Sequence, residues 1–459
     1  MTNKTFCILP WIHAQTKPDG QIKPCCRFDH KNPEYSMGGK NWKFDKFNIN
    51  TGSTYGDALA SSEWEELRQK MLKGEPVAGC WKCYKEEEDQ ETNIHKQGDR
   101  NHSMRTKENW TWNQRNEAEP IEENLDFKIR YLELSMGNYC NLKCRTCDGG
   151  LSTTWASDEI SMAKFYPERS KPASVDSELH LARGDILTIK ERWDIRDFSY
   201  VEEMKFTGGE PMLHPNFIKI MDMVISTGRA HLITLDIFTN SSWLPKDKVL
   251  DRLKQFKKVV INLSIDGVGK VNDYIRNPSK WSDVEGAVRQ WLEAKQSQPE
   301  VFEIKWHPCM SLYNVWQFPE MVDWWFDLNK EYFGTEWYHG QSRRTMIVNI
   351  VHYPSHLKLS LYPNKDELTA KLLESKQRYV SKLEQSELSE VDKRINFKHI
   401  DALYNKVIGP MNSPMNLDDL QYFIEFTADL DKLRDEDLRT DIPEIWNIIN
   451  TLVEYNGRL

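Results

Sequence analysis

Through the middle of the chain, short apolar stretches with strand character alternate with stretches in which apolar residues recur at helical spacing. Six stretches rich in β-branched and aromatic residues are expected to be strands, at 129–136, 201–207, 231–239, 258–266, 301–307 and 346–353. Helices are expected between some of them, at 215–228, 282–294 and 318–328. This alternation predicts an α/β fold with a parallel sheet, flat or curled into a barrel, whose chemistry lies at the C-terminal ends of the strands.

Two regions of different character flank this α/β region. The first is irregular and cysteine-rich, with one expected helix at 61–72 and an expected polar linker at 107–124. The last has no cysteine, and helices are expected in it at 365–383, 389–407, 417–433 and 443–455. We therefore expect three domains, at 1–125, 126–363 and 364–459, of which the last is a helical cap or docking module.

Composition excludes several classes of protein. Of the 459 residues 39% are apolar, and the 17 tryptophans add to an aromatic content typical of a globular protein. The net charge of −9 argues against a broad nucleic-acid-binding surface. The N-terminal stretch lacks the features of a signal peptide, and no stretch has the length of a membrane span. We therefore expect a soluble, cytoplasmic protein without a membrane partner.

The nine cysteines are typical of metal binding. They are an odd number, lie at short spacings and include the vicinal pair Cys25 and Cys26, which suits thiolate ligands in a reducing compartment better than a disulfide framework. Cys140, Cys144 and Cys147 form a three-cysteine loop directly after the strand expected at 129–136. This spacing would fit a structural zinc ion that takes its fourth ligand from elsewhere in the chain. A second interpretation is that the three cysteines lie in one loop by chance. The third interpretation is a [4Fe-4S] cluster that keeps one iron open to a non-protein ligand.

The three-cysteine loop resembles the CxxxCxxC signature of the radical S-adenosylmethionine (SAM) superfamily. In that superfamily the loop follows the first strand of a partial (β/α)6 TIM-like barrel. The stretch "TGGEP" at 207–211 ends the second expected strand and resembles the Gly-Gly-Glu motif that contacts the amino group of SAM. Gly208 and Gly209 would let the backbone approach a ligand, and Glu210 would accept a hydrogen bond from an ammonium group. The resemblance implies a [4Fe-4S] cluster and SAM as cofactors.

Further polar residues resemble SAM contacts. Ser264 and Asp266 in "INLSIDG" end the fourth expected strand, where similar enzymes bind the ribose and carboxylate of SAM. Residues two apart in a strand share a face, but a turn closed by Asp266 and Gly267 is the alternative interpretation. Asn240 in "TNSS" and Arg276 in "DYIRN" resemble residues that similar enzymes carry nearby.

The N-terminal cysteines have a spacing of their own, C-x12-G-x4-C followed by CxxC. It resembles the auxiliary-cluster signature of SPASM and twitch domains, which occur in radical SAM enzymes that modify peptides and proteins. The resemblance implies a second [4Fe-4S] cluster held by four cysteines, with Cys26 as an alternative ligand: Cys7, Cys25, Cys80 and Cys83. A structural zinc ion is the rival interpretation. Around Gly20, the stretch "HAQTKPDGQIKPCC" is expected to form a hairpin that returns Cys25 towards Cys7.

The resemblance implies a twitch-type radical SAM enzyme, an oxidoreductase that reductively cleaves SAM to a 5′-deoxyadenosyl radical. The radical would abstract hydrogen from a peptide or protein side chain, and a small electron-donor protein would supply the electron. A non-catalytic iron-sulfur protein for electron transfer or redox sensing is the alternative, and a zinc-stabilised interaction module is a third interpretation. Glu210 and the polar residues at the strand ends discriminate between them, because an electron carrier needs no SAM pocket.

Overall fold

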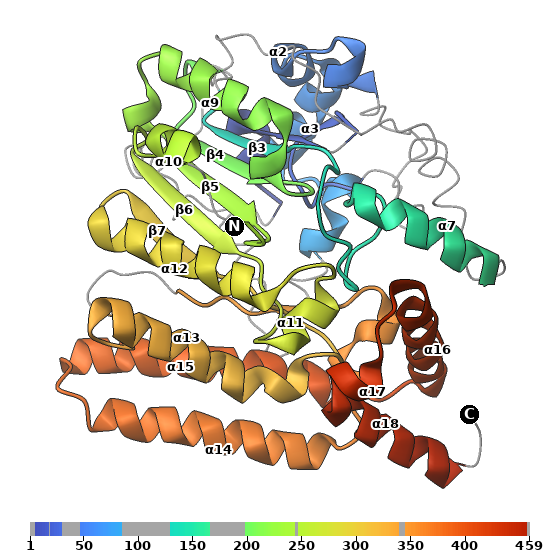
Figure 1. Cartoon of the computed structure of the whole chain (residues 1–459). Coiled ribbons are helices and arrows are strands. Elements are labelled where there is room, and N and C mark those ends of the chain that lie inside the picture. Colours follow the sequence, from blue (N-terminus) through green and yellow to red (C-terminus); the bar gives the residue numbers. More distant parts are fainter. Residues whose placement is uncertain are drawn as a thin grey trace. The chain divides into compact units, whose positions relative to one another are not determined.

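The computed structural model describes residues 5–17, 19–29, 46–84, 129–165, 198–243, 247–338 and 345–456 (Figure 1). The linker expected at 107–124 lies outside these residues. The chain forms two compact units. Unit 1 comprises Met1–Tyr139, Ile186–Ile237 and Lys248–Val259, and unit 2 comprises Cys140–Asp185, Phe238–Asp247 and Val260–Leu459.

A seven-stranded, mostly parallel sheet with the strand order β2-β1-β3-β4-β5-β6-β7 forms the centre of the fold. Its strands are β1 (His13–Thr16), β2 (Ile22–Lys23), β3 (Tyr131–Ser135), β4 (Glu203–Thr207), β5 (Thr234–Thr239), β6 (Lys258–Leu263) and β7 (Phe302–Trp306). Strands β1, β3, β4 and β5 pair in parallel in that order. The α/β partial-barrel fold expected from the sequence is therefore confirmed, together with a C-terminal helical region.

The N-terminal hairpin is present and extends the sheet. β1 pairs with β2 in antiparallel orientation, and the turn between them contains Gly20 with a φ of 85°, a left-handed conformation that favours glycine. A β-carbon at Gly20 would lie 2.5 Å from the Asn50 side chain. On its other edge, β1 pairs with β3 from His13 to Thr16. The region expected to be irregular thus contributes two strands, β1 and β2, to the main sheet.

The sixth expected strand does not join the main sheet as a full strand. Only an isolated parallel bridge joins Met346 to Trp306 of β7. Further along, β9 (Asn349–Ile350) pairs in parallel with β8 (Cys309–Met310) in a separate two-stranded sheet. Pro308, which has no N–H to donate, lies between β7 and β8 and separates the two ladders.

In unit 1, helix α9 (Pro215–Ser226) follows β4, as its sequence pattern predicts. The His214 side chain caps its first turn by accepting a hydrogen bond from the Asn216 N–H at 3.2 Å, and Pro215 stands at the first helical position. Its apolar face is buried, and the Phe217 ring lies edge-on to the Phe206 ring of β4 with centroids 5.3 Å apart. This packing fixes the course of the chain directly after the Gly-Gly-Glu segment.

In unit 2, α12 (Trp281–Ser297) and α13 (Phe318–Phe333) match the two other helices expected in the α/β region. Trp306 of β7 lies against Trp324 and Trp325 of α13, with ring centroids 5.2 and 5.7 Å apart. Two shorter helices, α7 (Ala156–Phe165) and α11 (Lys270–Ile275), were not expected from the sequence. Both lie close in sequence to candidate site residues.

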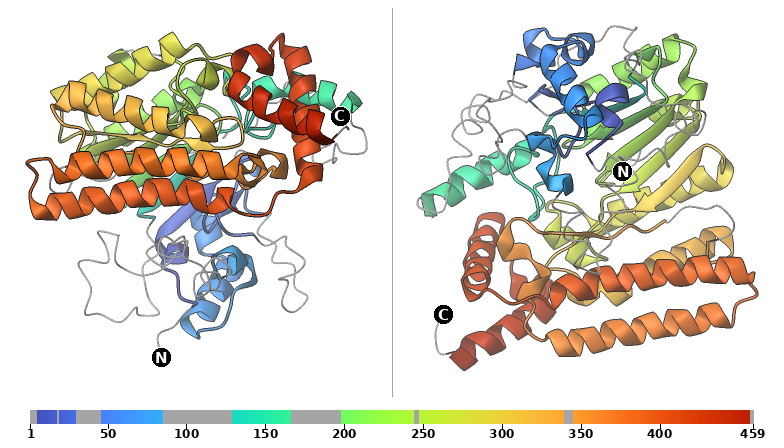
Figure 2. Two further views of the ribbon diagram at one scale, coloured as in Figure 1. Left: turned by 90° about the horizontal axis from the view of Figure 1, so that it is seen from below. Right: turned by 180° about the vertical axis from the view of Figure 1, so that it is seen from behind.

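The C-terminal region is helical, as expected, with α14 (Lys365–Glu384), α15 (Glu390–Met411), α16 (Leu417–Arg434), α17 (Leu438–Asp441) and α18 (Pro443–Asn456). Figures 1 and 2 show α14 and α15 side by side. Helix α13 also contacts α14. Helix α16 contacts α7 and α17. Among the described residues, no helix combines the length and apolar character that crossing a membrane requires.

Candidate functional site

The three-cysteine loop begins five residues after β3 ends. Cys140, Cys144 and Cys147 lie in a compact turn, in which the Cys147 N–H donates to the Cys144 carbonyl at 3.0 Å. The Leu142 N–H points at the Cys140 sulfur at 3.5 Å. Cys144 is buried, whereas Cys140 and Cys147 are half-buried. Burial raises the pKa of Cys144 to about 11 and also raises the pKa of Cys147.

The polar segment after β5 contacts the first cysteine of the loop. Asn240 Nδ2 lies 3.8 Å from the Cys140 sulfur and 2.9 Å from Asn141 Oδ1. Asn141 in turn donates from Nδ2 to Ser242 Oγ at 2.8 Å. The structure therefore brings Asn240 directly to the three-cysteine loop, where the motif comparison had expected a SAM contact.

Asp266 and Arg276 form a buried ion pair of 2.6 Å between Oδ2 and Nη1. Oδ1 of Asp266 accepts the Cys309 N–H at 2.8 Å, so both carboxylate oxygens already have donors from this chain. Burial acts to lower the pKa of Arg276, but Cys144 and Asp266 raise it above its ordinary value. The buried Arg276 Nε has no hydrogen-bond partner among the described residues. Arg276 therefore offers a donor, while Asp266 orients it.

Ser264 lies beyond the end of its strand. β6 stops at Leu263, and the Ser264 N–H donates to the Thr239 carbonyl at 2.8 Å. Asp266 is therefore part of the turn into α11, where its N–H donates to Asn272 Oδ1 at 3.2 Å. The alternative interpretation of this stretch, a turn at the strand end, describes the observed backbone better than a shared strand face does.

In unit 1, the Gly-Gly-Glu segment packs on the chain that leads into the three-cysteine loop. The Gly209 and Glu210 N–H groups donate to the carbonyls of Gly137 and Tyr139, both at 2.8 Å. A β-carbon at Gly209 would lie 2.3 Å from the Tyr139 oxygen, and Gly208 has a φ of 114°. The glycines therefore allow a close approach to the protein's own backbone. The Glu210 side chain is buried and is 1% exposed.

Five cysteines of unit 1 line one pocket: Cys7, Cys25, Cys26, Cys80 and Cys83. Cys26 is exposed and the other four are half-buried. The two segments that carry Cys25 and Cys80 are joined by a hydrogen bond from the Asp29 N–H to the Gly79 carbonyl at 2.9 Å. Burial and the four neighbouring thiols together raise the pKa of Cys25.

Both sets of thiols suit a metal group by their chemistry. Close packing of several cysteines away from solvent raises their pKa values, and a bound metal stabilises such thiols as thiolates. The three-cysteine loop places three thiols within eight consecutive residues, and three thiolates would suit a [4Fe-4S] cluster with one open iron. Among the described residues, no three Cys, His, Asp or Glu side chains are arranged to hold a single metal ion.

The sheet also carries a row of polar residues that the sequence analysis did not identify. Parallel pairing places four residues of β1, β3, β4 and β5 side by side: Gln15, Glu133, Lys205 and Asp236. Lys205 Nζ contacts Glu133 Oε1 at 2.9 Å. His13 lies on the same face as Gln15, and its Nδ1 lies 2.7 Å from the Pro24 carbonyl oxygen. Burial lowers the pKa of His13 from 6.5 to about 4.

The lowered pKa of His13 predicts a loss of stability in mild acid. Between pH 6.5 and pH 4 the unfolded chain takes up a proton at this histidine and the folded chain does not, so the free energy of unfolding falls as the pH falls. The slope contributed by His13 is at most about 1.4 kcal/mol per pH unit. Urea unfolding at several pH values should show a shallower pH dependence for His13→Gln than for the original protein. An unchanged slope in His13→Gln would contradict this assignment.

Comparison with known proteins identifies the family of the central segment. Residues 134–302 match the model of the radical SAM superfamily. This segment runs from β3 to the first residue of β7 and contains the three-cysteine loop, the Gly-Gly-Glu segment and Asn240. The chain therefore carries a radical SAM domain, and the resemblance recognised from the motifs is confirmed to that extent.

Curated relatives match over part of their length. The GTP 3′,8-cyclase of Haemophilus influenzae (strain PittEE) is 26% identical over 203 residues, which are 42% of this chain and 49% of that protein. Molybdenum cofactor biosynthesis protein 1 of Mus musculus is 28% identical over 136 residues, which are 30% of this chain and 17% of that protein. This chain thus spans about half, or less, of the length of these relatives.

Solved structures that match part of this chain include Streptococcus suis SuiB bound to S-adenosylmethionine. It is 16% identical, with a TM-score of 0.31, and the alignment covers 55% of this chain and 45% of that chain. The structure of native anSMEcpe with bound AdoMet and Cp18Cys peptide is also 16% identical, with a TM-score of 0.33, and covers 55% of this chain and 60% of that chain. The strand pairing of this chain, and not its likeness to these structures, defines its fold.

Residues that are distant in the sequence hold the three-cysteine loop from outside, and they were not among the predicted site residues. Arg145 lies inside the loop, is buried, and forms ion pairs with Asp431 and Glu436. Asp158 of α7 joins Lys143 of the loop to Arg434 of α16. No local pattern marks these residues, because the partners are separated by up to 291 positions in the sequence.

Proposed function

We propose that the chain is a radical SAM enzyme of the twitch type that acts on a peptide or protein side chain. The observation that carries the proposal is the set of contacts around the three-cysteine loop. The Gly-Gly-Glu segment is bonded to the backbone just before the loop, and Asn240 contacts Cys140. Two motifs that are distant from the loop in the sequence thus bond to it or to the residues directly before it, which supports the proposal that they serve one cofactor.

In this proposal Cys140, Cys144 and Cys147 hold a [4Fe-4S] cluster, and SAM binds at the open iron. When bound, these cofactors would supply one-electron reductive cleavage of SAM to methionine and a 5′-deoxyadenosyl radical, which would abstract hydrogen from the substrate. Glu210 is proposed to accept a hydrogen bond from the SAM ammonium group. Arg276, oriented by Asp266, is proposed to bind a carboxylate through its Nε, which has no hydrogen-bond partner within the described part of the chain. Asn240 and Ser264 are proposed to contact the remaining polar groups of SAM.

The N-terminal pocket is proposed to hold an auxiliary [4Fe-4S] cluster through Cys7, Cys25, Cys80 and Cys83. The support is that all four thiols line one pocket and that each of the other three acts on the ionisation of Cys25. The peptide or protein substrate rests on the resemblance of this cysteine spacing to twitch and SPASM domains, and so does a small electron-donor protein. A zinc ion in this pocket is the rival that metal analysis distinguishes.

Metal analysis of the intact protein, purified without oxygen, tests the proposal. We expect about eight irons with a matching amount of sulfide and no stoichiometric zinc. Reduction in the presence of SAM should then yield 5′-deoxyadenosine. Iron without any 5′-deoxyadenosine would instead support the electron-transfer or redox-sensing alternative, and about four irons with one zinc would contradict the auxiliary cluster alone.

A further inference from the structure

The main chain of the three-cysteine loop is anchored by its neighbours in unit 2. The Lys143 and Arg145 N–H groups donate to the carbonyls of Asn277 and Ile275, both at 2.7 Å. From the other side, Trp155 Nε1 donates to the Cys144 carbonyl at 2.6 Å. These bonds connect the loop to the end of α11 and to the start of α7.

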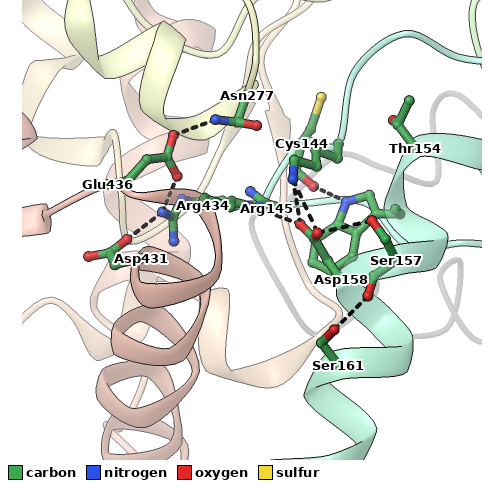
Figure 3. A network of polar contacts seen from close by, with 12 residues as sticks. Cys144, Arg145, Thr154, Ser157, Asp158, Ser161, Asn277, Asp431, Arg434 and Glu436 are labelled. Carbon is green, nitrogen blue, oxygen red and sulfur yellow. Dashed lines mark hydrogen bonds and ion pairs between the residues drawn. The ribbon is translucent and has the colours of Figure 1, made fainter.

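The side chain of Arg145 extends from the loop to the C-terminal helices (Figure 3). Its Nη2 contacts Asp431 Oδ1 at 2.5 Å and Glu436 Oε2 at 2.6 Å. Nε donates to the Tyr274 carbonyl at 3.1 Å, and the guanidinium carbon lies 3.7 Å from the centroid of the Tyr274 ring. The side chain is inaccessible to solvent, so its positive charge is balanced by these two carboxylates rather than by water.

Both carboxylates are held in place by further donors. Asp431 Oδ1 also accepts the Tyr274 hydroxyl at 2.7 Å, and its Oδ2 accepts the Leu438 N–H at 2.8 Å. Glu436 Oε1 accepts Asn277 Nδ2 at 2.7 Å. Helix α16 ends at Arg434, and the next residue, Asp435, adopts a left-handed conformation that turns the chain so that Glu436 faces the loop. The two carboxylates that bind Arg145 are therefore held in position by donors other than Arg145.

Helix α16 makes a second contact with the loop region. Arg434 Nε donates to Asp158 Oδ2 at 2.8 Å (Figure 3). Asp158 Oδ1 also accepts a hydrogen bond from Lys143 Nζ at 3.1 Å. The Arg434 guanidinium lies 4.8 Å from the centroid of the Trp155 ring. Apolar residues of α16 also pack against this region. Leu430 forms one buried cluster with Trp155 and Met162. The partly buried residues packed against this cluster are Cys147, Phe426 and Leu433.

We propose that α16 and the turn after it clamp the three-cysteine loop through Arg145, and that this clamp sets how readily the loop's metal group accepts an electron. The inference rests on the proposed function, because it takes the loop to hold the [4Fe-4S] cluster. Arg145 is a positioning residue that acts through Cys144, its neighbour in the chain. In a buried region, removing one charge of the set changes the local potential strongly, and cluster potentials respond to nearby net charge.

A purely structural role of the same residues makes a different prediction. If the helices only stabilised the fold, removing Arg145 or removing its partner Asp431 would loosen the loop in the same way and would change the potential in the same direction. If the charges matter, removing the cation should make reduction harder and removing the anion should make it easier. The sign of the change therefore separates the two explanations.

The first experiment is a reduction titration of the full-length protein, with the loop cluster identified by the spectral change on adding SAM. At a fixed potential, Arg145→Met should lower the ratio of reduced to oxidised cluster about tenfold, which is about 59 mV for one electron. Asp431→Asn should raise the ratio, and the charge-balanced double change Arg145→Met with Glu436→Gln should return towards the original protein. The control Arg439→Met, which removes an exposed ion pair with Asp437, should leave the ratio as it is. Shifts of the same sign in both single variants, or no shift in either, would overturn the electrostatic role.

The second experiment uses the full-length chain without metal, so it does not depend on the cluster. Hydrogen exchange at the Lys143 and Arg145 amides should be at least tenfold faster in Arg145→Met than in the original protein, with Arg145→Lys in between. If Arg145→Met does not fold, Glu436→Gln replaces it in the experiment, because Arg145 then keeps its ion pair with Asp431. Hydrogen exchange at the same two amides should then be about threefold faster than in the original protein. Unchanged exchange would overturn the clamp. If the loop binds no iron, the proposed function is contradicted, whereas the hydrogen-exchange result remains valid.

Discussion

Replacing Cys140, Cys144 and Cys147 together by alanine is expected to remove about four irons and to abolish the formation of 5′-deoxyadenosine. The three thiols come from one turn, and Cys144 is buried within it, so the triple change leaves no cysteine in the loop that could bind iron. The irons assigned to the N-terminal pocket should remain. Iron and sulfide analysis, together with chromatographic detection of 5′-deoxyadenosine after reduction, measures both effects.

Cys309→Ala is the matched control for this triple variant. Cys309 is close enough for Cys144 to affect its ionisation, and burial raises the pKa of its thiol to about 12. It lies outside the loop, and only its backbone N–H bonds to Asp266, so the substitution keeps that hydrogen bond. Its iron content should match that of the original protein. Normal 5′-deoxyadenosine formation in the triple variant would contradict the assignment of the loop.

Local sequence pattern predicted most of the fold because most elements bury a regular apolar face. Five of the expected strands join the main sheet, and α9 begins and ends where its proline and glycine predict. The sixth was wrong as a full strand of the main sheet, because Pro308 interrupts the ladder beside it. β1 was not recognised as part of the main sheet, because it is only four residues long and carries polar residues such as His13 and Gln15.

The candidate site was predictable only as far as its motifs are local. Spacing alone singled out the cysteines, Glu210 and Asn240, but it did not reveal how they are held. The two carboxylate partners of Arg145 lie 286 and 291 residues away, and a single arginine between cysteines has no pattern that points to them. For Asp266 the motif predicts a SAM contact, and only the folded structure shows that both of its carboxylate oxygens also accept hydrogen bonds within this chain. Long-range pairing of buried charges needs the folded structure.

The N-terminal pocket is best tested by point substitution, because deletion would damage the sheet. Residues 1–125 contain β1, which pairs with β3 along its whole length, so removing them would expose the edge of β3. Substitution of the hairpin cysteines leaves this pairing in place. Cys25 and Cys26 both line the pocket, although only Cys26 is exposed, so either thiol could reach a metal group there.

The double change Cys25→Ala with Cys26→Ala is expected to lower the iron content from about eight to about four. Cys26→Ala alone should keep about eight, and Cys25→Ala alone should have a mild effect, because Cys26 can take its place after a small shift of the hairpin end. A cluster with four cysteine ligands has no open iron, so the double variant should still form 5′-deoxyadenosine from SAM but should no longer modify its substrate. Loss of one zinc and no iron in the double variant would show that the pocket is a zinc site, while the three-cysteine loop would keep its proposed role.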